Sequence, residues 1–200
     1  MSERVRTAIL VSGRGSNMKA LVGAARRPDF PAEIALVLSD RPEAGGLAAA
    51  HEAGVAAEAV DFRRFSGKPA FEAALDARLR AAGVELICLA GFMRILSASF
   101  VERWEGRILN IHPSLLPDLR GLNTHERALA EARAEHGCTV HYVSAELDAG
   151  PIIAMARVAV LPGDDPETLA ARVLVEEHRI YPQALEAVAR ALRAPGVRAG

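Results

Sequence analysis

Short runs of β-branched and aliphatic residues recur along the chain, and most are followed by a segment with apolar residues at helical spacing. The runs predict strands at residues 7–11, 33–39, 56–60, 85–90 and 107–111. The segments between them predict helices at 18–25, 46–53, 68–82 and 97–103. Because strands and helices alternate with short connections, the pattern predicts a doubly wound, mostly parallel α/β sheet.

The last third of the chain has a different pattern. Two strands, at 137–143 and 151–161, are separated only by a turn, so we predict that they pair in the antiparallel sense at the edge of the sheet. Helices are predicted at 124–134 and 166–192, and Pro182 either kinks or breaks the second. The expected fold is Rossmann-like, with an antiparallel edge strand.

Length and composition support one domain. The chain has 200 residues, of which 50% are hydrophobic, so a sizeable core is available. We place a single domain at 1–193 and a flexible tail at the Pro- and Gly-containing end, 194–200. Cys88 and Cys138 lie in apolar runs and are expected to be buried thiols, which suits a reducing cytoplasm.

Charge and hydropathy exclude several classes of protein. The net charge of −1 argues against a broad electrostatic surface for nucleic acid. No stretch approaches the roughly 20 apolar residues needed to span a bilayer, and the first apolar run is too short for a signal peptide. We therefore expect a cytoplasmic protein without membrane or nucleic-acid partners.

Candidate chemistry gathers after the strand at 107–111. Side chains alternate along a strand, so Asn110 and His112 point to the same side, and Pro113 then ends regular pairing. In an open α/β sheet, ligands bind at the carboxyl ends of strands. The amide can donate to a carbonyl oxygen and the imidazole can move a proton near neutral pH, and Asp148 would complete the set if the fold brings it close. The simpler interpretation is that these residues only cap a strand and a turn.

A glycine-rich turn follows the first strand and precedes a helix. Residues Gly13 to Asn17 read GRGSN, and such a turn aims free backbone N–H groups at an anion. Ser16 or Asn17 can cap the helix or contact the anion directly. The third glycine of a dinucleotide fingerprint and the ending of a P-loop are both absent, so the pattern favours a phosphate monoester. A plain turn with a capped helix is the alternative.

Other polar residues have weaker assignments. His112, His125, His141 and Asp148 match no metal-ligand spacing, so we expect no metal. A lone strand histidine such as His141 is more often structural than catalytic, while His125 either faces the site or is solvated. Apolar residues at 92–96 follow a buried strand and either line a slot for a flat ring or belong to the core.

These motifs together resemble the folate-dependent formyltransferases, specifically the phosphoribosylglycinamide formyltransferases of purine synthesis. The resemblance covers nearly the whole chain, and its parts occur in order: SGRGSNMKAL, GFMRIL, NIHPSLLP, GLNTHERAL, HGCTVHYVSAELDAGPII and EEHRIYP. It implies the formyltransferase fold and the transfer of a formyl group from 10-formyltetrahydrofolate to the amine of glycinamide ribonucleotide. A cytoplasmic monomer or homodimer is expected.

The resemblance also assigns residues. Asn110, His112 and Asp148 match the catalytic trio. The ribonucleotide site matches Gly13, Arg14, Gly15, Ser16, Asn17 and Glu177. The folate site matches Lys68, Phe92, Met93, Arg94, Ile95, Leu96, Asn110, Glu146, Leu147 and Asp148.

Some positions depart from the family pattern, and related activities compete. Lys68 stands where an arginine is common, which keeps the charge but loses the bidentate fork, and Asn123 stands where histidine is common. The nearest alternative is a formyltetrahydrofolate deformylase, which carries an additional regulatory domain. A methionyl-tRNA formyltransferase is longer, and a non-catalytic nucleotide-binding module would make the trio coincidental.

Overall fold

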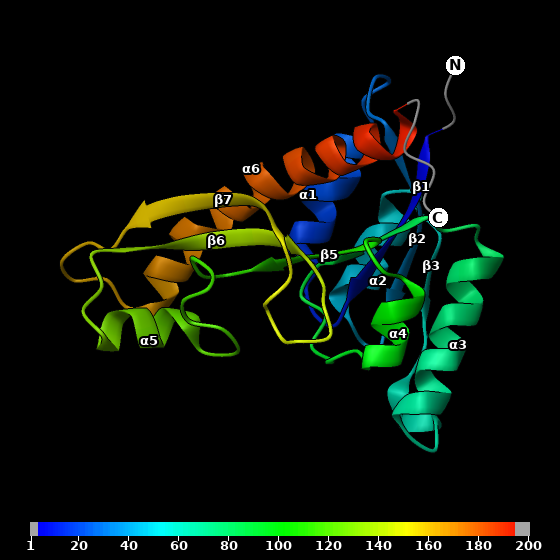
Figure 1. Cartoon of the computed structure of the whole chain (residues 1–200), viewed down its shortest axis with the longest axis horizontal. Helices are drawn as coiled ribbons and strands as arrows, with labels where there is room; N and C mark the ends of the chain where they lie inside the picture. The colour runs from blue at the N-terminus through cyan, green and yellow to red at the C-terminus, as the bar shows by residue number, and fades with distance from the viewer. Residues whose placement is uncertain (1–3, 195–200) are drawn as a thin grey trace.

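The fold is built on a seven-stranded sheet with the order β3-β2-β1-β4-β5-β6-β7 in a computed structural model that describes residues 4–194 (Figure 1). Its strands are β1 (Val5–Val11), β2 (Ala32–Ser39), β3 (Ala57–Ala59), β4 (Leu86–Leu89), β5 (Ile108–His112), β6 (Glu135–Tyr142) and β7 (Ile152–Ala159). The helices are α1 (Ser16–Ala25), α2 (Gly45–Glu52), α3 (Lys68–Ala81), α4 (Ala98–Arg103), α5 (Thr124–Ala130) and α6 (Pro166–Arg193), with a 3-10 turn η1 (Phe62–Arg64).

Among the described strands, β6 alone runs opposite to the others. Strands β1 to β5 pair in parallel, β6 is antiparallel to β5, and β7 is antiparallel to β6. The predicted mostly parallel α/β sheet with an antiparallel edge is confirmed. The reversal at β6 lets a strand from the end of the chain lie directly beside the strand that carries Asn110 and His112.

Two hydrophobic layers cover the sheet, and β1 contributes to both because its side chains alternate. Ile9 and Val11 pack with α1, α2 and α6, whereas Ala8 and Leu10 pack with α3 and α4. In Figure 1, α3 and α4 lie at the end of the sheet away from β6 and β7. The face of β5 to β7 toward the viewer is therefore left to loops rather than to a helix.

Helix α6 is continuous over 28 residues and passes through Pro182. A proline inside a helix costs roughly 3 kcal/mol, so packing must compensate for it. Tyr181 is fully buried beside it, and its hydroxyl donates to the carbonyl oxygens of Leu89 (2.9 Å) and Leu109 (3.1 Å). Those bonds join α6 to the ends of β4 and β5.

The two ends of the described chain meet at the amino ends of the strands. Arg193 at the end of α6 donates to both carboxylate oxygens of Glu85 (2.5 and 2.9 Å) and to the carbonyl oxygen of Arg4 (3.2 Å). The tail expected at 194–200 lies outside the described residues except for Ala194.

Of the helices between residues 4 and 194, none combines the length and hydropathy needed to cross a membrane.

Candidate active site

Asn110 and His112 lie at the carboxyl end of β5, on one face of the sheet. Ile108, two residues earlier, packs into the core under α3 and α4, so alternation places Asn110 and His112 on that same face. No helix covers the face at this point, and the side chain of Asn110 is only partly buried. The strand thus carries its apolar residues into the core and its two polar residues, Asn110 and His112, at its carboxyl end.

The reversed strand β6 places His141 directly opposite Asn110. The amide nitrogen of Asn110 lies 3.2 Å from Nε2 of His141, and Nδ1 of His141 lies 2.8 Å from the carbonyl oxygen of Tyr142. A carbonyl only accepts, so Nδ1 of His141 carries the proton and Nε2 accepts from Asn110. Burial lowers the pKa of His141 and so favours this neutral form, although Asp148 opposes the shift.

Our assignment of His141 as structural therefore missed its contact with a candidate catalytic residue. Directly opposed residues of an antiparallel pair share a face, which would have grouped His141 with Asn110 once the register was known.

His112 is buried between a carbonyl and a carboxylate. Its Nε2 lies 3.0 Å from the carbonyl oxygen of Leu119, and its Nδ1 lies 3.4 Å from Oδ2 of Asp148. Because the carbonyl of Leu119 cannot donate, Nε2 carries a proton in either charge state. Protonation of Nδ1 would direct the second N–H of the ring at Asp148. One ring nitrogen of His112 is therefore held by a carbonyl and the other faces a carboxylate.

Asp148 lies in the turn between β6 and β7, with its side chain only 7% exposed. Its φ of 50° places it in the left-handed region, which is uncommon for residues other than glycine and recurs at functional sites. The carboxylate accepts a hydrogen bond from the backbone N–H of Gly121 (3.0 Å) and lies 3.7 Å from Nε2 of His141. The structure thus brings the predicted trio into one cluster.

The long loop after His112 is held by hydrogen bonds to Thr139. The hydroxyl of this fully buried residue donates to the carbonyl oxygen of Ser114 (2.7 Å) and accepts from the N–H of Leu116 (3.1 Å). At the other end of the loop, Arg120 pairs with Glu146 (2.5 Å). The loops 113–122 and 144–150 therefore contact each other next to His112.

The glycine-rich turn presents a helix N-terminus at the same edge of the sheet. Gly15 is the N-cap of α1, with φ of 76° and no side-chain cap, so neither Ser16 nor Asn17 caps the helix. A Cβ on Gly15 would lie 2.8 Å from Cα of Gly46, so both conformation and space require glycine. The first N–H groups of α1 have no side-chain acceptor and remain available to an anion.

Asn17 links this turn to α6. Its amide nitrogen donates to Oε2 of Glu177 (2.6 Å), while its buried Oδ1 has no hydrogen-bond partner among the described residues. Burial raises the pKa of Glu177, against the hydrogen bond from Asn17. An unpaired buried oxygen beside a buried carboxyl is a place where a ligand hydroxyl would supply the missing donor.

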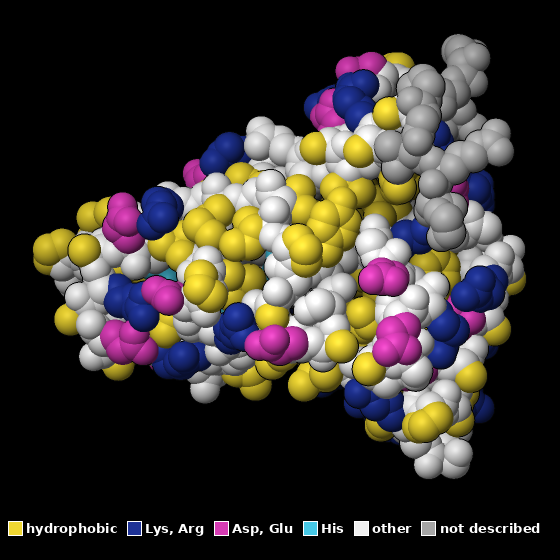
Figure 2. Space-filling model, viewed as in Figure 1, with side chains coloured by type: hydrophobic (Ala, Val, Ile, Leu, Met, Phe, Trp, Pro, Cys, Tyr) yellow, Lys and Arg dark blue, Asp and Glu magenta, His cyan; other side chains and the backbone are white. Residues whose placement is uncertain are grey.

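The segment after β4 divides into core and exposed residues. Phe92 and Leu96 are buried in the layer under α3 and α4, whereas Met93 and Ile95 are 61% and 66% exposed. Leu147, in the turn that carries Asp148, is 48% exposed. Figure 2 shows hydrophobic side chains gathered on this face over β5 to β7. Exposed apolar side chains at a strand end are a suitable wall for a flat ring.

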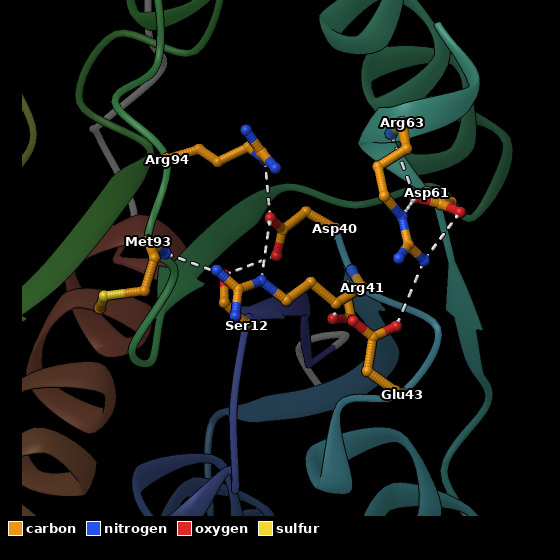
Figure 3. A network of polar contacts seen from close by, with 9 residues as sticks. Ser12, Asp40, Arg41, Glu43, Asp61, Arg63, Met93 and Arg94 are labelled. Atoms are coloured by element: carbon orange, nitrogen blue, oxygen red, sulfur yellow. Dashed lines mark hydrogen bonds and ion pairs between the residues drawn. The ribbon is translucent and has the colours of Figure 1, made fainter.

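Two cationic residues predicted to bind folate lie in different surroundings. The guanidinium of Arg94 is directed at the buried carboxylate of Asp40 (2.6 Å; Figure 3). Lys68 lines a cavity of about 590 Å³ between α3 and α4, with Glu72, Ser97 and Arg103. That cavity includes none of the trio.

His125 and His136 form a pair that is separate from the trio. Nδ1 of His125 lies 3.1 Å from Nε2 of the buried His136, so His125 is neither fully solvated nor bonded to the trio. Burial is the first cause that lowers the pKa of both, in His136 to about 4. Among residues 4–194, no group of three or more His, Cys, Asp or Glu side chains is placed to hold a metal ion.

Comparisons with known proteins agree with this geometry. Residues 5–185 match the formyl transferase family. A solved phosphoribosylglycinamide formyltransferase from Brucella melitensis is 52% identical, with a TM-score of 0.90, and the match covers 99% of this chain and 100% of that one. The phosphoribosylglycinamide formyltransferase of Escherichia coli K12 is 42% identical over 87% of this chain and 82% of its own length.

Longer relatives also match. The trifunctional purine biosynthetic protein adenosine-3 of Gallus gallus is 47% identical over 94% of this chain, which spans 19% of that protein. The chain therefore corresponds to about a fifth of these relatives. With the fold, the site and the comparisons in agreement, this chain belongs to the formyl transferase family, among the phosphoribosylglycinamide formyltransferases.

Proposed function

We propose that this protein transfers the formyl group of 10-formyltetrahydrofolate to the amine of 5-phosphoribosylglycinamide, as a step of de novo purine biosynthesis. The observation that carries the proposal is the cluster of Asn110, His112 and Asp148 at the carboxyl edge of the sheet. The same edge carries a helix N-terminus suited to a phosphate and an exposed apolar segment suited to a ring. We place the reaction in the cytoplasm, with the enzyme as a monomer or homodimer.

The ribonucleotide would bind through the glycine-rich turn. Its phosphate suits the uncapped N–H groups at the start of α1, where the helix dipole adds partial positive charge. The exposed side chain of Arg14 can add a charged contact. A ribose hydroxyl can donate to the unpaired Oδ1 of Asn17 or bond to Glu177 beside it. These contacts account for both ends of a phosphoribosyl group.

The folate would lie against the exposed apolar residues. Met93, Ile95 and Leu147 offer surface for the pteridine ring, and the backbone from Glu146 to Asp148 offers polar contacts at its edge. Lys68 keeps the positive charge of the arginine that is common at this position of the family. Phe92 and Leu96 would support this wall from the core rather than contact the ring.

In the reaction, the folate supplies the formyl carbon, and the amine of the ribonucleotide attacks it. Negative charge then develops on the formyl oxygen. One N–H of Asn110 is occupied by His141, and the other is available to that oxygen. A donor aimed at a developing oxyanion typically contributes about 3 kcal/mol.

His112 and Asp148 would stabilise the developing charge and assist proton transfer. Asp148 would favour a protonated imidazole ring on His112, whose positive charge would stabilise the oxyanion through space, since both ring nitrogens already face other acceptors. Asp148 can also assist the transfer of a proton from the attacking amine to the leaving nitrogen, directly or through water. No covalent nucleophile is needed, and holding both substrates in reactive orientation supplies several kcal/mol more.

The test is an absorbance assay that follows loss of the formyl group from 10-formyltetrahydrofolate, with and without glycinamide ribonucleotide. Loss of the formyl group only with the ribonucleotide would support the transferase. Formate release without the ribonucleotide would favour a deformylase. No reaction under either condition would contradict the proposal.

A further inference from the structure

A buried carboxylate joins the two substrate-binding segments. Ser12 directly follows β1 and precedes the glycine-rich turn, and its hydroxyl donates to Oδ1 of Asp40 at 2.6 Å. The same hydroxyl oxygen accepts from the backbone N–H of Met93 at 2.8 Å. The N–H of Ser12 also donates to the carbonyl oxygen of Gly91 (3.1 Å). The turn and the apolar segment are therefore bonded to each other through Ser12.

The second oxygen of Asp40 holds the apolar segment from its other side. Nε of Arg94 donates to Oδ2 of Asp40 at 2.6 Å, and its guanidinium carbon lies 3.5 Å from the centre of the Phe62 ring. Figure 3 shows Arg94 and Ser12 converging on Asp40 from different segments. Arg41 is the other cation near this oxygen, at 4.0 Å, and it is half exposed.

The position of Asp40 explains why this arrangement is firm. Its side chain has no exposed surface, while the side chain of Arg94 is 30% exposed. A buried carboxylate is costly unless charged and polar donors satisfy it, so the fold that buries Asp40 also fixes the donors around it. Bonds from an ionised donor to an ionised acceptor are roughly twice as strong as neutral ones.

We propose that Asp40 is a positioning residue that holds the phosphate-binding turn and the folate-binding segment in a fixed relation through Ser12 and Arg94. Its two oxygens have different roles. Oδ1 accepts the hydrogen bond from Ser12 and so positions both segments, whereas Oδ2 accepts from Arg94 and so positions the folate-binding segment alone. Arg94 then serves the folate site through its backbone and its neighbours Met93 and Ile95, not through its guanidinium. This inference rests on the proposed function for the identity of the two ligands.

Two substitutions at Asp40 distinguish the contributions of its two oxygens. Asp40→Asn keeps an oxygen for Ser12 but loses the charge that holds Arg94. We expect the Kd for tetrahydrofolate to rise about tenfold, equivalent to about 1.4 kcal/mol, with the KM for the ribonucleotide changed less than about twofold. Asp40→Ala removes both bonds, so both constants should rise by about tenfold or more.

A double variant tests whether Asp40 positions the folate-binding segment through Arg94, and a nearby single variant serves as the control. Asp40→Asn combined with Arg94→Gln should bind tetrahydrofolate no more than about twofold worse than either single variant, because both remove the same interaction. The matched control is Glu43→Gln, which removes an exposed ion pair with Arg63 in the same region (3.4 Å) and should leave both constants unchanged.

Hydrogen exchange of the segment 91–96 in the free protein gives a readout that needs no ligand. The N–H of Met93 should exchange faster in Asp40→Ala than in wild type, because its acceptor Ser12 is released. Unchanged exchange and unchanged constants in folded Asp40 variants would overturn the positioning role while leaving the proposed function intact. A wild-type protein that neither binds tetrahydrofolate nor turns over would overturn the function, and the exchange rates would still decide the role of Asp40.

Discussion

The amide of Asn110 donates to Nε2 of His141 across the antiparallel pair of β5 and β6. The opposite nitrogen of His141 is fixed by the carbonyl of Tyr142, so the ring cannot turn away without losing a bond. One N–H of Asn110 is thereby held in the sheet, and the direction of its second N–H is set. The proposed oxyanion donor thus depends on the orientation of His141.

Replacing His141 by alanine should therefore lower kcat by about tenfold to a hundredfold, less than removing the oxyanion donor itself. The free amide of Asn110 would rotate, while the substrate-binding segments stay in place, so KM values should change little. Steady-state kinetics with both substrates checks this. His51→Ala, on the exposed side of α2, is the matched control and should behave as wild type. An unchanged kcat would show that Asn110 needs no such partner.

Asp148→Asn should reduce turnover by about 10²-fold to 10⁴-fold, because it removes the carboxylate that faces Nδ1 of His112 and that is proposed to assist proton transfer. The amide oxygen can still accept from the N–H of Gly121, so the turn should keep its conformation. Circular dichroism and thermal unfolding check the fold beside kinetics. Glu135→Gln breaks an exposed ion pair with Arg157 and serves as the control. Near-normal turnover would contradict the role of Asp148.

Gly150 should not tolerate a side chain. An added Cβ would lie 1.8 Å from the carbonyl oxygen of Tyr142, the acceptor that orients His141. Gly150→Ala must therefore move either that carbonyl or the turn that carries Asp148. We expect a loss of stability of about 1–3 kcal/mol together with a loss of activity. Gly23→Ala in α1, where nothing lies within 4 Å, is the control and should be neutral or slightly stabilising. Urea unfolding and kinetics on both variants decide the matter.

Folding stability should fall below pH 6.5 because of His136. Burial lowers its pKa from 6.5 to about 4, so the folded state favours the neutral ring. This contribution is complete above pH 6.5 and is lost as the pH falls from there toward 4. For one such group the loss between pH 7 and pH 5 is about 2 kcal/mol. Urea unfolding at these two pH values should show it, and His136→Gln should reduce the difference. An equal pH dependence in the variant would contradict the assignment.

Much of the sheet could be predicted because its interior strands are buried on both faces and read as apolar runs. The predicted strand at 85–90 is observed as β4, Leu86–Leu89, for this reason. Helix ends were less accurate. The helix predicted at 124–134 ends at Ala130, because the chain turns at Ala132, which adopts a left-handed backbone conformation. An alanine gives no sequence signal for such a turn. At Pro182 the sequence allowed either a kink or a break. The helix continues because Tyr181 is buried in the core, and local helix propensity does not include such tertiary packing.

The candidate site was predictable only where residues share one strand or one turn. Alternation put Asn110 and His112 on one side, and the structure places them there. Partners across strands depend on order and register, which the sequence does not display. His141 lies opposite Asn110 only because β6 runs antiparallel to β5, and Asp40 reaches Ser12 because β2 pairs with β1. The same holds for His125, whose contact with His136 joins α5 to the start of β6.

The contacts of Arg193 with Glu85 and with the backbone of Arg4 have a consequence for how this domain can be attached to others. They fix both ends of the described chain side by side, at the amino ends of the strands and away from the carboxyl ends where the site lies. A linker at either end would therefore leave the candidate active site uncovered. Such a domain can be joined into a longer polypeptide without rebuilding its catalytic face, which is consistent with its relatives that are about five times as long.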